Sequence, residues 1–122
     1  MGYRSDVKYV IDFTSKEAKT AFMAQVRMIG GALQEALDET TSDDRYTNRI
    51  YFSADNVKWY DSYGDVKSHN RLMEMAEEQP PEMCNGYHFV RIGEEVDDIE
   101  TRYGGEEPPY DAINIHRSVD FD

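Results

Sequence analysis

The chain has 122 residues, 39% of them hydrophobic, and a formal net charge of -12. Its length is typical of one domain, and its hydrophobic content excludes a largely disordered protein. Residues 74–122 hold three Lys or Arg against fourteen Asp or Glu, so the negative charge is concentrated in the second half. Because such a chain repels phosphate groups, we expect no direct binding to nucleic acid.

The first forty residues predict a strand followed by a helix. Residues 7–13 alternate in polarity, and the apolar set comprises Val7, Tyr9, Ile11 and Phe13. Apolar Val10 on the other face favours a central position in a sheet. Thr14 as N-cap and Glu17 three residues later form a capping box that predicts a helix start. The apolar stripe of this helix is interrupted at Gly30-Gly31 and comprises Ala18, Phe22, Val26, Ile29, Leu33 and Leu37.

The middle of the chain predicts a polar loop at 38–44, a hairpin and a second helix. Short aromatic-rich strands at 49–53 and 57–60 flank a turn at 54–56. The period of two places Val57 and Trp59 on the same face as Ile50 and Phe52. Asp65 is the expected cap of the second helix, which ends before Pro80-Pro81. The apolar stripe of that helix comprises Val66, His69, Leu72, Met73 and Ala76.

The last third predicts strands at 87–92 and 112–122 around an acidic stretch at 93–109. That stretch has one base, Arg102, and seven carboxylates: Glu94, Glu95, Asp97, Asp98, Glu100, Glu106 and Glu107. As a helix, it would place Val96, Ile99 and Tyr103 on one side. As a hairpin, residues 89–94 would turn and return through 99–103. We favour the hairpin because it continues a sheet.

The order of these elements is β-α-β-β-α-β with one or two further strands. It predicts an α+β fold, a two-layer sandwich in which two helices cover one face of a mainly antiparallel, ferredoxin-like sheet. We expect residues 1–122 to form a single domain.

No pattern in the sequence indicates catalysis or a cofactor. Phosphate-binding glycine loops and nucleophile motifs are missing. The lone Cys84 excludes thiolate zinc sites and is expected to be a half-buried apolar residue in a reducing compartment. His88 and His116, on neighbouring expected strands, are a candidate metal pair, although ordinary surface histidines are commoner there. We therefore expect no enzyme, no metal and no cofactor.

Two motifs resemble a group of small proteins encoded by tailed bacteriophages. They are the N-terminal Met1-Gly-Tyr-Arg-Ser-Asp-Val7 and the later Phe89-Val-Arg-Ile-Gly-Glu94 with Asp97-Asp-Ile-Glu100. The Arg-Ser pair in His116-Arg-Ser-Val119 is also similar. The resemblance implies a viral origin, an accessory role and a location in the host cytoplasm, and it brings no catalytic residues. The N-terminus has no apolar signal core and no apolar run approaches a membrane span, so we expect no membrane contact.

The leading hypothesis is a small acidic accessory protein that binds and inhibits a host protein, in defence or nucleic-acid processing. A negative face can occupy a basic nucleic-acid site, as a nucleic-acid mimic. The expected contact residues are Glu94, Glu95, Asp97, Asp98, Glu100, Tyr103, Glu106, Glu107 and Tyr110. The expected helpers are Asp43, Asp44, Glu77, Glu78, Asp120 and Asp122. The alternative is a ligand-binding or sequestering module that uses the sheet face or a subunit interface. A homodimer through an edge strand at 112–121 is left open.

Overall fold

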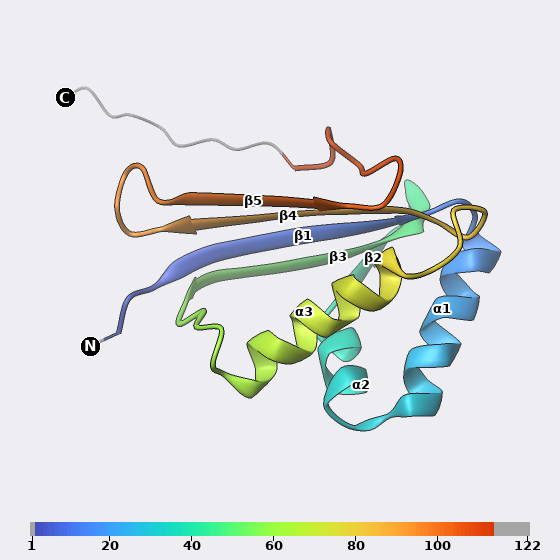
Figure 1. The fold of residues 1–122 in the computed structure, drawn as a ribbon, viewed down its shortest axis with the longest axis horizontal. Coiled ribbons are helices and arrows are strands. Elements are labelled where there is room, and N and C mark those ends of the chain that lie inside the picture. Colours follow the sequence, from blue (N-terminus) through green and yellow to red (C-terminus); the bar gives the residue numbers. More distant parts are fainter. Residues whose placement is uncertain (1, 114–122) are drawn as a thin grey trace.

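The computed structural model describes residues 2–113, which form one five-stranded antiparallel sheet and three helices. The sheet order is β2-β3-β1-β4-β5 (Figure 1). The elements are β1 (Ser5–Phe13), α1 (Lys16–Ile29), α2 (Gly31–Asp38), β2 (Thr41–Asp43), β3 (Tyr46–Val57), α3 (Gly64–Glu77), β4 (Cys84–Gly93) and β5 (Ile99–Gly104). The predicted α+β class and two-layer arrangement are confirmed.

β1 is the central strand, as the apolar residues on both of its faces predicted. It pairs antiparallel with β3 and with β4, and Tyr9 lies opposite Phe52 on one side and Phe89 on the other. Because both neighbours run opposite to β1, they are parallel to each other, and α3 connects them. This is the predicted split β-α-β arrangement, with β1 inserted between the two parallel strands.

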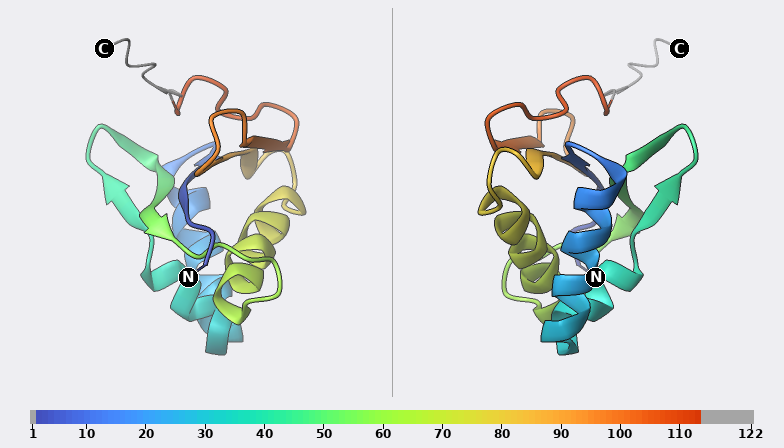
Figure 2. Two further views of the ribbon diagram at one scale, coloured as in Figure 1. Left: turned by 90° about the vertical axis from the view of Figure 1, so that its left-hand side faces the viewer. Right: turned by 90° about the vertical axis from the view of Figure 1, so that its right-hand side faces the viewer.

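The helices cover one face of the sheet and enclose the core (Figure 2). The apolar face of β1 and the predicted stripe of α3 are buried as expected. The α3 helix begins at Gly64, so Asp65 lies in its first turn and Tyr63 is the N-cap residue. None of the helices in residues 2–113 combines the length and the apolar character needed to cross a bilayer.

The predicted single first helix is wrong, because the chain forms two helices that meet at Gly30. Gly30 has φ 70°, a conformation that glycine adopts without strain, and its N–H closes α1 on the carbonyl of Val26. The chain then turns into α2. Ile29 therefore leaves the apolar stripe and is 63% exposed, whereas Val26 and Leu33 stay buried.

The predicted N-cap of α1 is also wrong by one residue. Ser15 is the N-cap, and its hydroxyl accepts a hydrogen bond of 3.0 Å from the N–H of Ala18. The hydroxyl of Thr14 instead donates to the carbonyl of Glu82 at 2.6 Å. Thr14 thus joins the start of α1 to the segment that precedes β4.

The predicted hairpin at 54–56 is wrong, because those residues lie inside the long strand β3. β3 pairs with β1 from Arg49 to Val57, and this ladder continues past the expected turn, with a register shift between Ala54 and Val57 where Asn56 has φ 57°. The hairpin instead joins β2 to β3, where Asp43 accepts a hydrogen bond of 2.8 Å from the N–H of Arg45. Trp59 lies beyond β3 but packs on Phe52, on the predicted face.

The predicted hairpin of β4 and β5 is confirmed. The predicted strand at 112–122 does not begin at Ala112. Ala112 and Ile113 are irregular, and the N–H of Ala112 donates to the carbonyl of Pro109. The rest of the predicted strand, residues 114–122, lies outside the described residues. The edge at 112–121 proposed for a homodimer thus has no strand at 112–113. After β5 the chain turns back, and residues 105–113 lie over the sheet face opposite the helices (Figure 2).

Candidate functional site

The structure divides the nine residues of the predicted contact surface among three places. Glu94, Glu95, Asp97 and Asp98 lie in the turn between β4 and β5, and Glu100 and Tyr103 lie on β5. Glu106, Glu107 and Tyr110 lie on the returning segment 105–113, where the two acids follow the opposite end of β5. Six residues of antiparallel strand span about 20 Å, which separates the two acidic ends. The predicted single acidic face is therefore two acidic clusters with a strand between them.

The N-terminal segment holds the turn between β4 and β5 in place. The hydroxyl of Tyr3 donates to Asp98 Oδ2 at 2.6 Å and accepts from the N–H of Glu95 at 3.1 Å. The N–H of Arg4 donates to Glu94 Oε2 at 2.6 Å. The hydrogen bond to the Asp98 carboxylate raises the pKa of Tyr3. Glu94 and Asp98 thus help to hold the fold together, and Glu95 and Asp97 are two further exposed acids at this end.

Two arginines neutralise the carboxylates at the start of β5. Arg91 on β4 contacts Asp98 at 2.9 Å and Glu100 at 3.0 Å. Both contacts raise the pKa of Arg91, and the contact with Asp98 has the larger effect. Arg102 approaches Glu100 at 3.4 Å from the same strand. Glu100 and Asp98 are therefore internal ion-pair partners and contribute little net charge to the surface.

Tyr103 and Tyr110 lie together on the sheet face opposite the helices. Tyr103 stacks on His88 with a centroid distance of 4.4 Å, and Tyr110 packs on Tyr103 at 4.8 Å. His88 is 2% exposed, and its two ring nitrogens make no hydrogen bond of good geometry. Burial lowers the pKa of His88, and the nearby backbone of Pro109 opposes this shift. Both tyrosines are partly exposed, as a contact surface requires.

The acids at the other end, Glu106 and Glu107, are positioned by a close backbone crossing. The N–H of Glu107 donates to the carbonyl of Asn85 at 2.9 Å. A Cβ on Gly86 would lie 2.0 Å from the carbonyl oxygen of Gly104, and one on Gly105 would lie 2.4 Å from that of Asn85. Only glycine fits at these two positions, so this acidic pair is also held on an ordered element.

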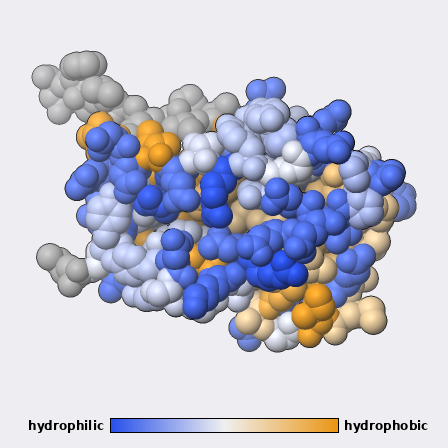
Figure 3. Space-filling model, viewed as in Figure 1, coloured by the Kyte–Doolittle hydropathy of each residue, from blue (hydrophilic) through white to orange (hydrophobic). Residues whose placement is uncertain are grey.

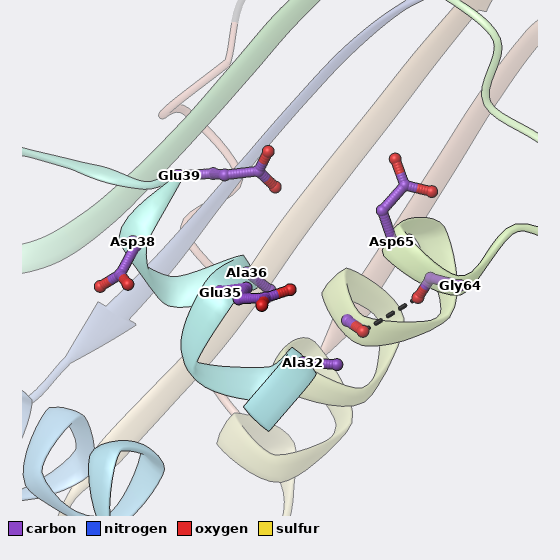
Figure 4. A pocket seen from close by; sticks show the side chains of 8 residues that line it. Ala32, Glu35, Ala36, Asp38, Glu39, Gly64 and Asp65 are labelled. Carbon is purple, nitrogen blue, oxygen red and sulfur yellow. Dashed lines mark hydrogen bonds between the residues drawn. The ribbon is translucent and has the colours of Figure 1, made fainter. Parts of the chain in front are cut away.

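A further acidic site, which the sequence did not indicate, lies between α2 and α3. It is a cavity of about 530 Å³ lined in part by Ala32, Ala36, Gly64 and Ser68. In Figure 4 the carboxylates of Glu35 and Glu39 point from α2 toward α3, whereas Asp38 points away. Asp65 lies at the start of α3, where its Oδ1 accepts a hydrogen bond of 2.9 Å from the N–H of Val66. These acids are 26 or more positions apart across the two helices (Glu39 to Asp65), so no local spacing could have predicted their meeting.

A buried hydrogen-bonded chain begins at Glu39 beside this cavity. His69 Nε2 lies 2.7 Å from Glu39 Oε1, and His69 Nδ1 lies 2.6 Å from the hydroxyl of Tyr9. Burial lowers the pKa of His69, and Glu39 opposes this shift. Burial also raises the pKa of Tyr9. His69 and Tyr9 are 1% and 0% exposed, so neither reaches a molecule in the cavity, and only Glu39 meets solvent.

The next question is whether the described residues include a metal site or a reactive thiol. Among residues 2–113, no three His, Cys, Asp or Glu side chains gather in a way that could hold a metal ion. The candidate metal pair of His88 and His116 stays a prediction, because His116 lies beyond the described residues. Cys84 is buried, which raises its pKa to about 11 and leaves it protonated at neutral pH.

Comparison of the chain with protein-family models, with curated proteins and with solved structures finds no match.

Proposed function

We propose that this protein is a non-catalytic binding protein that docks on a basic surface of a partner protein. The observation that carries the proposal is the pair of exposed acidic clusters at the two ends of β5, Glu95 with Asp97 and Glu106 with Glu107. Each pair is held on an ordered element, so its position needs no further ordering when a partner binds. Exposed charges of this kind steer association and give specificity.

The surface around these clusters supports the same proposal. Figure 3 shows a mostly hydrophilic face with small apolar areas, and Val96 and Ile99 beside the first cluster are exposed by 76% and 41%. Tyr103 and Tyr110 add aromatic area between the clusters. Interfaces concentrate binding energy in such aromatic groups, while charges around them set the choice of partner.

The resemblance to bacteriophage proteins adds a setting to this proposal. In that setting the partner is a host protein in the bacterial cytoplasm, and binding inhibits it. A partner that normally binds nucleic acid has the basic surface that two fixed acidic clusters complement, with carboxylates in place of phosphates.

Capture from a bacterial lysate across a salt series tests the proposal. The test variant replaces Glu95, Asp97, Glu106 and Glu107 by their amides. The control variant makes the same charge change at Glu17, Glu35, Asp38 and Asp44, none of which lies near β5 in the chain. We expect the wild type and the control to retain a partner at low salt, and the test variant to lose it.

Two outcomes would contradict this assignment. A partner held equally by the test variant, at low and high salt, would exclude a charge-driven contact at β5. Loss with the control alone would place the contact at one of the four control positions, away from β5. Competition by duplex DNA tests the narrower form of the proposal, in which the partner surface is a nucleic-acid site.

A cavity on the second sheet face favours one alternative, a small-ligand-binding module. It measures about 400 Å³ and is lined in part by Lys8, Val10, Tyr51 and Ile113. Apolar lining residues together with the cation of Lys8 suit a small anionic ligand. A thermal shift with nucleotides that disappears in Lys8→Met would support this alternative, and unchanged unfolding temperatures would reject it for nucleotides.

A further inference from the structure

β5 is an edge strand whose outward backbone groups can be identified from the register. The N–H of Gly93 donates to the carbonyl of Asp98 at 2.8 Å, which makes these two residues a hydrogen-bonded pair. Because such pairs alternate in an antiparallel ladder, Glu100 and Arg102 also direct their backbone groups to β4. Thr101 and Tyr103 therefore direct theirs away from the sheet.

The backbone groups of this edge are accessible within residues 2–113. No strand of that range pairs with the outer side of β5, and Thr101 and Tyr103 are exposed. Arg102 lies over the ring of Phe89 at 4.1 Å on the helix side. The ring of Tyr103 lies over His88 on the opposite side. These large side chains thus extend above and below the sheet, and the edge between them is open.

The charges at the two ends of β5 oppose pairing with a second copy of this chain. An antiparallel copy centred on Thr101 would bring Glu95 and Asp97 of one chain beside Glu106 and Glu107 of the other. Four carboxylates would then meet at each end, and like charges placed opposite one another destabilise strand pairing. A strand with basic residues at both ends would meet opposite charges in the same places.

We propose that β5 accepts an extended, basic segment of the partner protein as a sixth strand of the sheet. This inference rests on the proposed function and specifies how the partner docks. The outward backbone groups of Thr101 and Tyr103 bind the main chain of the segment. The acidic clusters select lysines or arginines about 20 Å apart, the length of the strand between them. Tyr103 supplies aromatic contact on one face.

The probe is a fluorescein-labelled peptide of about nine residues, with alternating valine and threonine between two lysines at each end. One control peptide has glutamates in place of the lysines. A second control keeps the lysines but carries methyl groups on alternate backbone nitrogens, which removes strand pairing and leaves the charge unchanged. Fluorescence anisotropy at low salt measures the affinity of each peptide for the full chain.

Thr101 offers a matched pair of protein variants. Thr101→Pro removes one outward N–H and leaves the ladder to β4 intact, because proline is tolerated at an edge when its nitrogen faces solvent. Thr101→Val keeps the N–H and the shape. We expect Thr101→Val to bind the lysine peptide like the wild type, and Thr101→Pro to bind it about tenfold more weakly. Circular dichroism checks that both variants fold.

The outcomes separate the two proposals. If the lysine peptide binds Thr101→Pro and Thr101→Val alike, and the methylated peptide binds as well, strand addition is wrong although the charged surface stands. If the lysine peptide does not bind, strand addition is again wrong, and the lysate capture decides the proposed function independently. If Thr101→Pro fails to fold, the wild-type protein still tests the proposal. Strand addition requires the wild type to bind the methylated peptide more weakly than the lysine peptide. Equal binding of the two peptides would overturn strand addition.

Discussion

His69 on α3 and Glu39 at the end of α2 are joined by a contact of 2.7 Å between Nε2 and Oε1, although 30 positions separate them. A carboxylate only accepts hydrogen bonds, so Nε2 carries the proton, and Nδ1 accepts from the hydroxyl of Tyr9. The lowered pKa of His69 agrees with this neutral form. The chain from Glu39 to Tyr9 thus links both helices to the central strand.

Removal of the hydroxyl in Tyr9→Phe should destabilise the protein. The ring stays in the core, but Nδ1 of the buried His69 loses its partner. An unsatisfied buried group of this kind costs about 1–3 kcal/mol. The free energy of unfolding in urea measures the loss. Tyr46→Phe is the control, since Tyr46 is 47% exposed, and equal stability of the two variants would show that the buried chain contributes nothing.

The pH dependence of stability should report the buried histidines. Burial lowers the pKa of both His69 and His88 below 6.5, so the folded protein binds these protons less readily than the unfolded chain. The stability that the two neutral histidines contribute to the folded state is fully present above about pH 6.5 and is lost as the pH falls through their pKa values in the folded protein. The unfolding temperature should therefore fall between about pH 7 and pH 5.

His88→Phe should make that fall smaller. Phenylalanine keeps the stacking on Tyr103 and has no nitrogen to protonate or to leave without a partner. The contribution of His69 then remains. The measurement is the unfolding temperature of variant and wild type at each pH. If the unfolding temperatures of variant and wild type fell equally with pH, the surroundings of His88 would not oppose its protonation.

Gly86→Ala should be strongly destabilising. Gly86 has φ +144°, and an added Cβ would lie 2.0 Å from the Gly104 carbonyl oxygen, so the crossing that places Glu106 and Glu107 must open. We expect a loss of about 2–4 kcal/mol in the free energy of unfolding. Gly64→Ala is the control, because nothing lies within 4 Å of its added Cβ. Similar losses in both variants would contradict the role of the crossing.

Tyr3→Phe should loosen the turn between β4 and β5 without unfolding the protein. The variant loses the hydrogen bonds to Asp98 and Glu95 that tie the turn to the N-terminal segment. Hydrogen exchange should accelerate in residues 94–98 and stay unchanged in β1. Tyr63→Phe serves as the comparison, since Tyr63 is exposed and makes its ring contact with Tyr60. Unchanged exchange in 94–98 would mean that the other contacts of the turn, among them those of Arg4 and Arg91, hold it without the hydroxyl of Tyr3.

The sequence was most informative where a pattern repeats along one element. The alternation in residues 7–13 predicted the buried face of β1, and the spacing of Val66, His69 and Leu72 predicted that of α3. The choice of a hairpin for 89–103 was also correct. These features follow from burial of one side of a regular element, which local periodicity encodes.

Turns and element ends were predicted less well, because tertiary contacts decide them. The ladder with β1 keeps residues 54–56 within β3, and the bond from Thr14 to Glu82 leaves the N-cap to Ser15. Gly30 adopts a positive φ that divides the helix in two. In each case a local signal was present, but a partner distant in sequence selected another conformation.

The sequence by itself determined that the protein is acidic, that its fold is α+β and that its second half carries most of the charge. Only the tertiary structure decided which acids are available to a partner. Arg91 and Arg102 neutralise Asp98 and Glu100, while Glu95 and Asp97 are separated from Glu106 and Glu107 by the length of β5. The physical reason is that net charge is a sum over residues, whereas a binding surface depends on distances that folding alone sets.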